Sequence, residues 1–144
     1  MKKHELNIPL SREIATKYNK VLRVRECYQN IARCADAYLP SFTTGKWKIA
    51  YGYYTASPKI PHLLARHCFI LDENDCVVDP TIMLRHEDSE LSGYEYFVMK
   101  SFDDYKDYLR AIIRDRYYDM TKTLIPYDRR ASIWANQNGY LLLD

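Results

Sequence analysis

Apolar residues recur every three or four positions in two long stretches of the chain, a period that predicts helices. The first stretch is residues 26–39, and Pro40 ends it because proline cannot continue a helix. The second is residues 102–118, which follows Ser101 as a capping residue. The predicted inward-facing residues are Cys27, Ile31, Cys34, Ala35 and Tyr38 in the first helix, and Tyr105, Tyr108, Leu109, Ile112 and Ile113 in the second.

Alternating or short continuous apolar runs predict strands between these two helices. Gly52 interrupts the first run, which indicates a β-bulge or a close approach of another backbone. Residues 56–62 contain two prolines and are predicted to form a loop. The predicted strands are 46–54, 66–71, 76–79 and 94–99.

Smaller elements complete the prediction. Residues 11–19 and 131–135 have the pattern of short helices, and Leu141 to Leu143 form an apolar tail. Together the elements predict an α+β fold in a single domain, residues 1–144. In this fold the helix 26–39 packs against an antiparallel sheet, and the helix 102–118 is added on the C-terminal side.

The hairpin of residues 66–81 has a polar side chain near each end. His67 opens its first strand and Asp79 closes its second, and neither residue type fills a core without a polar partner. Side chains of a strand alternate between faces, so the two share a face only if the connecting loop has an odd number of residues. A three-residue loop with a bulge satisfies this condition, and we expect one near Asn74.

Cys27 lies in the first turn of the helix 26–39, where unpaired backbone amides and the helix dipole favour an anion such as a thiolate. The alternative is that Cys27 belongs to the core, since it continues an apolar stripe and cysteine is among the most buried residue types. A histidine and an aspartate on one face of a hairpin favour the reactive thiol, because the three residue types together can form a catalytic triad. Cys34, further along the same face, is expected in the core.

The composition is that of an ordinary globular protein, with 47% hydrophobic and 28% charged residues. Tyrosine is unusually frequent, with 14 residues against four phenylalanines, and it suits half-buried faces and binding surfaces. The formal net charge of +2 does not indicate a nucleic-acid partner. Nothing in the sequence indicates a cofactor or an oligomeric state.

No apolar run resembles a membrane span or follows the basic N-terminus as in a signal peptide. We therefore expect a cytoplasmic protein without a membrane partner, in which all four cysteines are thiols. A metal site is not expected, because the sequence has neither a C-x-x-C nor an H-x-x-x-H pair.

Three segments resemble the transglutaminase-core and papain-like cysteine hydrolase superfamily. The resemblance covers about half of the chain and implies a papain-like fold with a Cys-His-Asp catalytic triad. It implies that Cys27 is the nucleophile, His67 the base, and Asp79 the residue that orients the histidine. The segments are Glu26-Cys27-Tyr28-Gln29-Asn30, Arg66-His67-Cys68-Phe69 and Cys76-Val77-Val78-Asp79-Pro80-Thr81.

The chain departs from that family at identifiable positions. Cys68 follows the histidine where many members have tryptophan. The segment around Cys27 is also similar to that of arylamine N-acetyltransferases, but paired glycines are missing and Gln29 replaces a glutamate. The candidate oxyanion donors are the backbone amide of Cys27 and the side chain of Asn19, which could equally end the preceding helix.

These features predict a thiol protease or amidase, a cysteine-nucleophile hydrolase acting on amide bonds of a protein or peptide substrate. Capture of the acyl-enzyme by an amine would instead give transglutaminase-like or acyltransferase activity. The loop 56–65 is expected near the substrate entrance, where His62 is either a solvated residue or a ligand. The alternative from another class is an inactive papain-like binding module, using the tyrosines or the charged segment 110–116.

Overall fold

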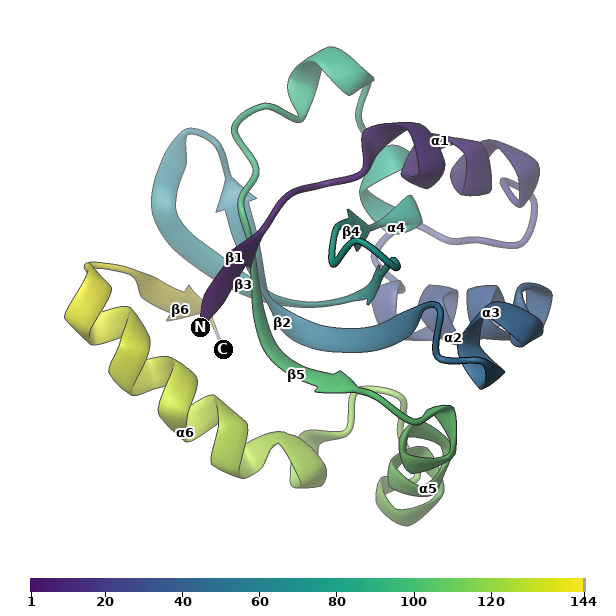
Figure 1. Ribbon diagram of the computed structural model, residues 1–144. Coiled ribbons are helices and arrows are strands. Elements are labelled where there is room, and N and C mark those ends of the chain that lie inside the picture. Colours follow the sequence, from purple (N-terminus) through teal and green to yellow (C-terminus); the bar gives the residue numbers. More distant parts are fainter. Residues whose placement is uncertain (144) are drawn as a thin grey trace.

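The structure, a computed structural model, describes residues 1–143 and confirms the α+β class (Figure 1). Within those residues the strands are β1 (Lys2–His4), β2 (Lys48–Ser57), β3 (Ile60–Leu71), β4 (Val77–Val78), β5 (Tyr96–Phe102) and β6 (Leu141–Leu143). They form one sheet in the order β1-β5-β2-β3-β4, and β6 pairs with β3. The β6–β3 pairing is parallel, so the sheet is mixed and not purely antiparallel as predicted.

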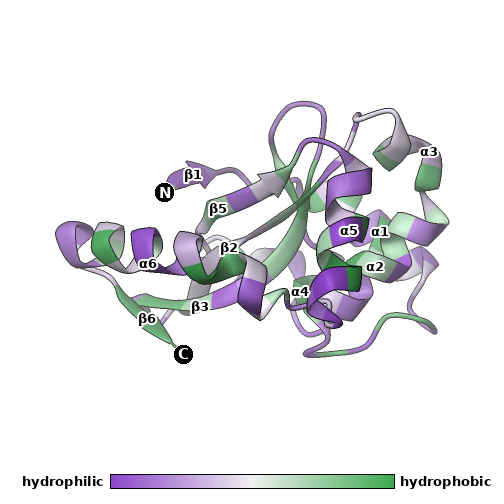
Figure 2. Cartoon of the chain, turned by 90° about the horizontal axis from the view of Figure 1, so that it is seen from below, coloured by the Kyte–Doolittle hydropathy of each residue, from purple (hydrophilic) through white to green (hydrophobic). Residues whose placement is uncertain are grey.

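Helices cover both faces of this sheet. They are α1 (Ile8–Lys17), α2 (Cys27–Ala37), α3 (Leu39–Thr43), α4 (Pro80–Met83), α5 (Tyr105–Asp115), α6 (Thr121–Asn138) and the short 3-10 helix η1 (Asp88–Glu90). In Figure 1, α1 and α4 lie side by side, and α6 runs along β5. Figure 2 shows a hydrophobic stretch in β3, whose residues 67–71 are all buried. No helix of residues 1–143 combines the length and the apolar composition that crossing a bilayer requires.

The core has one large cluster between α2 and the sheet. Ile31 and Cys34 of α2 pack there with Tyr51 of β2, and all three are almost completely buried. Ala50, Phe69 and Tyr96 form a second cluster on the sheet. Because neighbouring residues of a strand point to opposite faces, the sheet can bury Tyr51 beneath α2 while Ala50 packs in the second cluster.

The prediction that residues 56–62 form a loop is wrong. Strand β2 runs to Ser57 and β3 begins at Ile60, so the two strands form a long hairpin with a tight connection at Pro58 and Lys59. The prolines are tolerated because one lies in the turn and Pro61 lies at the exposed start of its strand, where a missing amide donor costs little. The segment 56–65, expected as a loop at the substrate entrance, is therefore mostly strand.

The C-terminal third also differs from the prediction. Strand β5 extends to Phe102, so the helix predicted over 102–118 covers only 105–115, and Asp104 caps it in place of Ser101. The short helix predicted over 131–135 is part of the 18-residue helix α6. Only Leu124, Ala131 and Ala135 of α6 are buried, which left too narrow an apolar stripe for the helix to be recognised.

Gly52 lies where β2 bulges against β5, as the sequence suggested. The β2–β5 register shifts between Tyr51 and Gly52, and a Cβ atom on Gly52 would lie 1.9 Å from the carbonyl oxygen of Phe97. We expect Gly52→Ala to lower the free energy of unfolding by at least about 2 kcal/mol in urea denaturation, because backbone must move.

Gly139→Ala is the matched control for that variant. Its Cβ would meet no atom within 4 Å, and only its φ of 77° is unfavourable, at a cost of about 1 kcal/mol. Equal losses in the two variants would contradict the close approach at Gly52.

Candidate active site

The turn of the β3–β4 hairpin sets the relation between His67 and Asp79. The amide of Asp72 donates to the carbonyl of Cys76 at 2.9 Å, which leaves a loop of residues 73–75. Asp75 adopts a left-handed φ of 58°, as expected for the last residue of a three-residue hairpin loop. The loop has an odd number of residues, as the sequence analysis required. It therefore places the side chains of His67 and Asp79 on one face of the hairpin.

The Asp72 side chain stabilises this turn. Its Oδ1 atom accepts hydrogen bonds from the amides of Asn74 at 2.9 Å and Cys76 at 3.0 Å. Its Oδ2 atom accepts from the Asn7 side chain at 2.9 Å. Asp72 is 5% exposed, so these contacts also satisfy a nearly buried carboxylate. The register of the hairpin is therefore fixed by side-chain contacts as well as by strand pairing.

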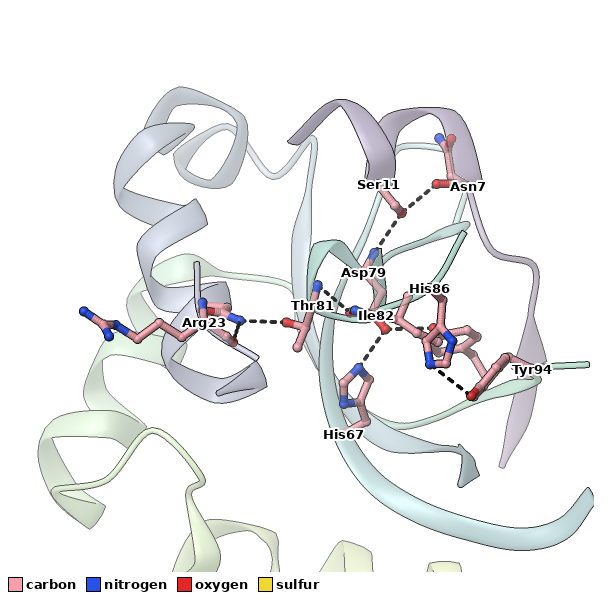
Figure 3. A network of polar contacts seen from close by, with 11 residues as sticks. Asn7, Ser11, Arg23, His67, Asp79, Thr81, Ile82, His86 and Tyr94 are labelled. Atoms are coloured by element: carbon pink, nitrogen blue, oxygen red, sulfur yellow. Dashed lines mark hydrogen bonds and ion pairs between the residues drawn. The ribbon is translucent and has the colours of Figure 1, made fainter. Parts of the chain in front are cut away.

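The Asp79 carboxylate is fully buried and accepts several hydrogen bonds (Figure 3). His67 Nε2 lies 2.7 Å from Asp79 Oδ2, and the hydroxyl of Tyr96 donates to the same oxygen at 2.7 Å. Asp79 Oδ1 accepts from the amides of Thr81 and Ile82, at 3.1 and 3.4 Å, and so caps α4. Both oxygens of this buried carboxylate therefore have hydrogen-bond partners.

The His67 ring is held from two directions. Besides its contact with Asp79, it stacks on the ring of Tyr54 at a centroid distance of 4.2 Å and an interplanar angle of 18°. Burial lowers the pKa of His67, but the charges of Asp79 and Cys27 and hydrogen bonding to both raise it further. The pKa is therefore well above its ordinary value. The contacts with Asp79 and Cys27 thus favour the protonated imidazolium form of His67.

Cys27 is the first residue of α2, and its side chain lies beside His67. The two residues line one cavity of about 220 Å³. The Nε2 atom of the His67 ring is hydrogen-bonded to Asp79, so Nδ1 is the ring nitrogen that can contact the Cys27 thiol. The amide of Cys27, in the first turn of α2, has no partner within the helix. The structure thus brings together Cys27, His67 and Asp79, the three residues that the sequence singled out.

Asn30 joins the start of α2 to α4, a role that the sequence analysis missed. Its side chain pairs with both backbone groups of Arg23, at 3.0 and 2.7 Å, and donates to Thr81 Oγ1 at 3.0 Å. It is fully buried. The sequence did contain a signal for this role, because Asn30 is a polar residue on the inward face of α2 and a buried polar side chain needs a hydrogen-bond partner.

The N-terminal segment also supports Asp79. Helix α1 begins at Ile8 with Asn7 as its cap, and not at Ser11 as the pattern suggested. The hydroxyl of Ser11 donates to the Asn7 carbonyl at 2.6 Å and accepts from the amide of Asp79 at 2.9 Å (Figure 3). Ser11, which was expected at the start of a helix, therefore positions the backbone of Asp79.

Several other candidates lie away from this cavity. Asn19 is exposed and lines a separate hollow beside α1, so its proposed role as oxyanion donor is wrong. His62 is exposed near the start of β3. Cys34 is in the core as expected, and burial raises its pKa to about 12. The four cysteines are all free thiols.

A larger hollow, of about 360 Å³, lies between β5, α5 and α6 and is lined by neither cysteine nor histidine. Within residues 1–143, no three side chains of His, Cys, Asp or Glu are grouped so as to hold a metal ion. Comparisons of the chain with protein-family models, curated proteins and solved structures found no match.

Proposed function

We propose that this protein is a cysteine-nucleophile acyl-transfer enzyme with a papain-like arrangement, acting on amide bonds of a protein or peptide. The observation that carries the proposal is that Cys27 and His67 line the same cavity, and that His67 Nε2 lies 2.7 Å from Oδ2 of the buried Asp79. A thiol, an imidazole and an orienting carboxylate in this relation are the parts of a nucleophilic triad.

The proposed reaction begins with an ion pair of the Cys27 thiolate and the His67 imidazolium. The thiolate attacks the carbonyl carbon of the amide and forms a tetrahedral intermediate, whose oxyanion is near the first-turn amides of α2. His67 then gives its proton to the leaving amine as the carbon–nitrogen bond breaks. The resulting thioester is resolved by water, which gives hydrolysis, or by an amine, which gives acyl transfer.

The surroundings of His67 support this assignment. A raised pKa keeps the ring protonated, as an ion pair with a thiolate requires. Tyr54 and Asp79 restrict the plane and the direction of the ring, and Tyr96 holds the carboxylate that orients it. A buried histidine of purely structural function would not need to face an open cavity beside a thiol.

The test is selective alkylation by iodoacetamide near pH 6.5, followed by peptide mapping. We expect Cys27 to react at least about tenfold faster than the half-buried Cys76, because a thiolate is the reactive species. Cys34 and Cys68 should remain unlabelled, since burial raises the pKa of both thiols and shields them.

A second readout is the mass of the intact protein after incubation with peptide amides or an activated ester. An added acyl group that disappears in Cys27→Ala would support the thioester intermediate. Equal and slow alkylation of Cys27 and Cys76, without an acyl adduct, would reject the enzyme and leave the inactive binding module.

A further inference from the structure

The wall of the Cys27–His67 cavity is strongly basic. Its lining contains Arg25, Arg66 and Arg85 together with His67, and it contains no aspartate or glutamate. A concave site lined by one sign of charge concentrates ligands of the opposite sign. Apart from Cys27, the other lining residues have uncharged side chains, so the arginines dominate the electrostatic character of the cavity.

The three arginines differ in their partners. Arg66 forms an ion pair with Asp128 of α6, whose other oxygen accepts a hydrogen bond from Tyr53 at 3.0 Å. Arg25 and Arg85 are exposed, and no carboxylate of residues 1–143 lies within ion-pair distance of either. Two guanidinium groups at the cavity therefore have unused capacity for an anion.

The backbone of Arg25 adds a second observation. Arg25 has a left-handed φ of 66°, which is unusual for a residue with a side chain and costs about 1 kcal/mol or more. The paired hydrogen bonds of Asn30 to Arg23 hold the loop just before it. Strain of this kind is concentrated at functional sites, where it directs a side chain or a backbone group.

Arg85 lines the cavity from a different element. It follows α4, and its amide donates to the Ile82 carbonyl at 3.3 Å, so its position depends on the helix that Asp79 caps. Arg25 precedes α2, the helix that carries Cys27. The two arginines thus flank the thiol from two elements whose relative position Asn30 fixes through Thr81.

We propose that Arg25 and Arg85 bind an anionic group of the substrate, a carboxylate or a phosphate, close to the amide that Cys27 attacks. This inference rests on the proposed function and adds a substrate class to it. Guanidinium groups suit both anions because they donate two parallel hydrogen bonds to a pair of oxygens. An acidic or phosphorylated peptide would therefore be preferred to a neutral one.

The test compares iodoacetate with iodoacetamide, which share the reacting carbon and differ in charge. We expect the iodoacetate-to-iodoacetamide rate ratio at Cys27 to exceed the ratio at Cys76 by about tenfold or more in low salt. Arg25→Gln and Arg85→Gln should each lower the Cys27 ratio by about threefold, a typical size for an exposed charge pair. About 1 M salt should reduce the difference between parent and variants.

Arg129→Gln is the matched control, since Arg129 is exposed on α6 and does not line the cavity. It should leave the ratio unchanged. Protection of Cys27 from iodoacetamide by millimolar succinate or inorganic phosphate, but not by neutral succinamide, identifies the preferred anion. Protection by one anion or by both supports the inference.

The two proposals fail in different ways in this experiment. Fast alkylation of Cys27 by both reagents, with a ratio that neither Arg25→Gln nor Arg85→Gln lowers and with no protection by either anion, overturns the anionic substrate alone. Alkylation of Cys27 no faster than that of Cys76 with either reagent overturns the proposed enzyme and the substrate class with it.

Discussion

Replacing His67 with alanine is expected to lower any amide turnover by about a thousandfold or more and to change how Cys27 reacts with pH. In the parent, the imidazolium stabilises the thiolate, so alkylation of Cys27 should vary little between about pH 5.5 and 8. The raised pKa of His67 favours this proposed ion pair at neutral pH, and we expect the pair to be lost as the pH rises through that pKa.

In His67→Ala the alkylation rate should instead rise about tenfold per pH unit up to the ionisation of a free thiol, near pH 8.5. Thiolates of low basicity are weaker nucleophiles, so the rate difference at about pH 6 is nearer tenfold than the several hundredfold that ionisation alone gives. His62→Ala is the control, because His62 lies outside the cavity. Identical profiles in parent and His67→Ala would show that Cys27 is an ordinary core thiol.

Asp79→Asn is expected to reduce turnover by about 10⁴-fold, because an amide holds the His67 ring in the wrong tautomer and cannot stabilise its charge. The charge of Asp79 is the main cause that raises the pKa of His67 against the effect of burial. Without it, the pKa of His67 should fall, because burial lowers this pKa and only the contact with Cys27 remains to raise it. Histidine titration by NMR measures this change directly.

The same variant should lose about 3 kcal/mol of stability at pH 6, since an asparagine cannot satisfy all the donors around Asp79. A raised pKa of His67 stabilises the folded state fully below the ordinary histidine value of about 6.5, and this contribution fades as the pH rises through the folded pKa. The difference between parent and Asp79→Asn should therefore shrink from pH 6 to pH 9 in urea denaturation.

Tyr96→Phe provides the matched comparison for Asp79→Asn. It removes one hydrogen bond to Asp79 Oδ2 and keeps the charge. We expect turnover to fall by less than tenfold and the pKa of His67 to stay raised. If Tyr96→Phe and Asp79→Asn had equal effects on the His67 titration, the charge of Asp79 would not be the cause of the raised pKa.

The local part of the site was predictable from the sequence. Cys27 follows from a helical period and its first turn, and the relation of His67 to Asp79 follows from strand alternation plus an odd loop. Each of these arguments uses residues within one element or one hairpin. The α+β class was predictable for the same reason, since the periods of its helices and strands are local.

The parts of the fold and the site that were not predicted depend on contacts between segments that are distant in sequence. The parallel pairing of β6 with β3 and the helix α6 are stabilised by packing on the sheet, and α6 buries too few side chains to produce a clear period. Asn30, Tyr54 and Tyr96 take their places in the site only because of the register of β2, β3 and β5 and the packing of α2. A period along one segment does not contain that information.

The buried carboxylate has a consequence for the order in which the chain becomes reactive. Asp79 is held by His67, Tyr96 and Ser11, which are 12, 17 and 68 residues away in sequence. Forming these contacts requires closing loops of those lengths, which costs chain entropy that contacts within one helix turn do not. An unfolded chain lacks the His67–Asp79 pair beside Cys27, so the proposed nucleophile can arise only once these segments have come together in the folded sheet.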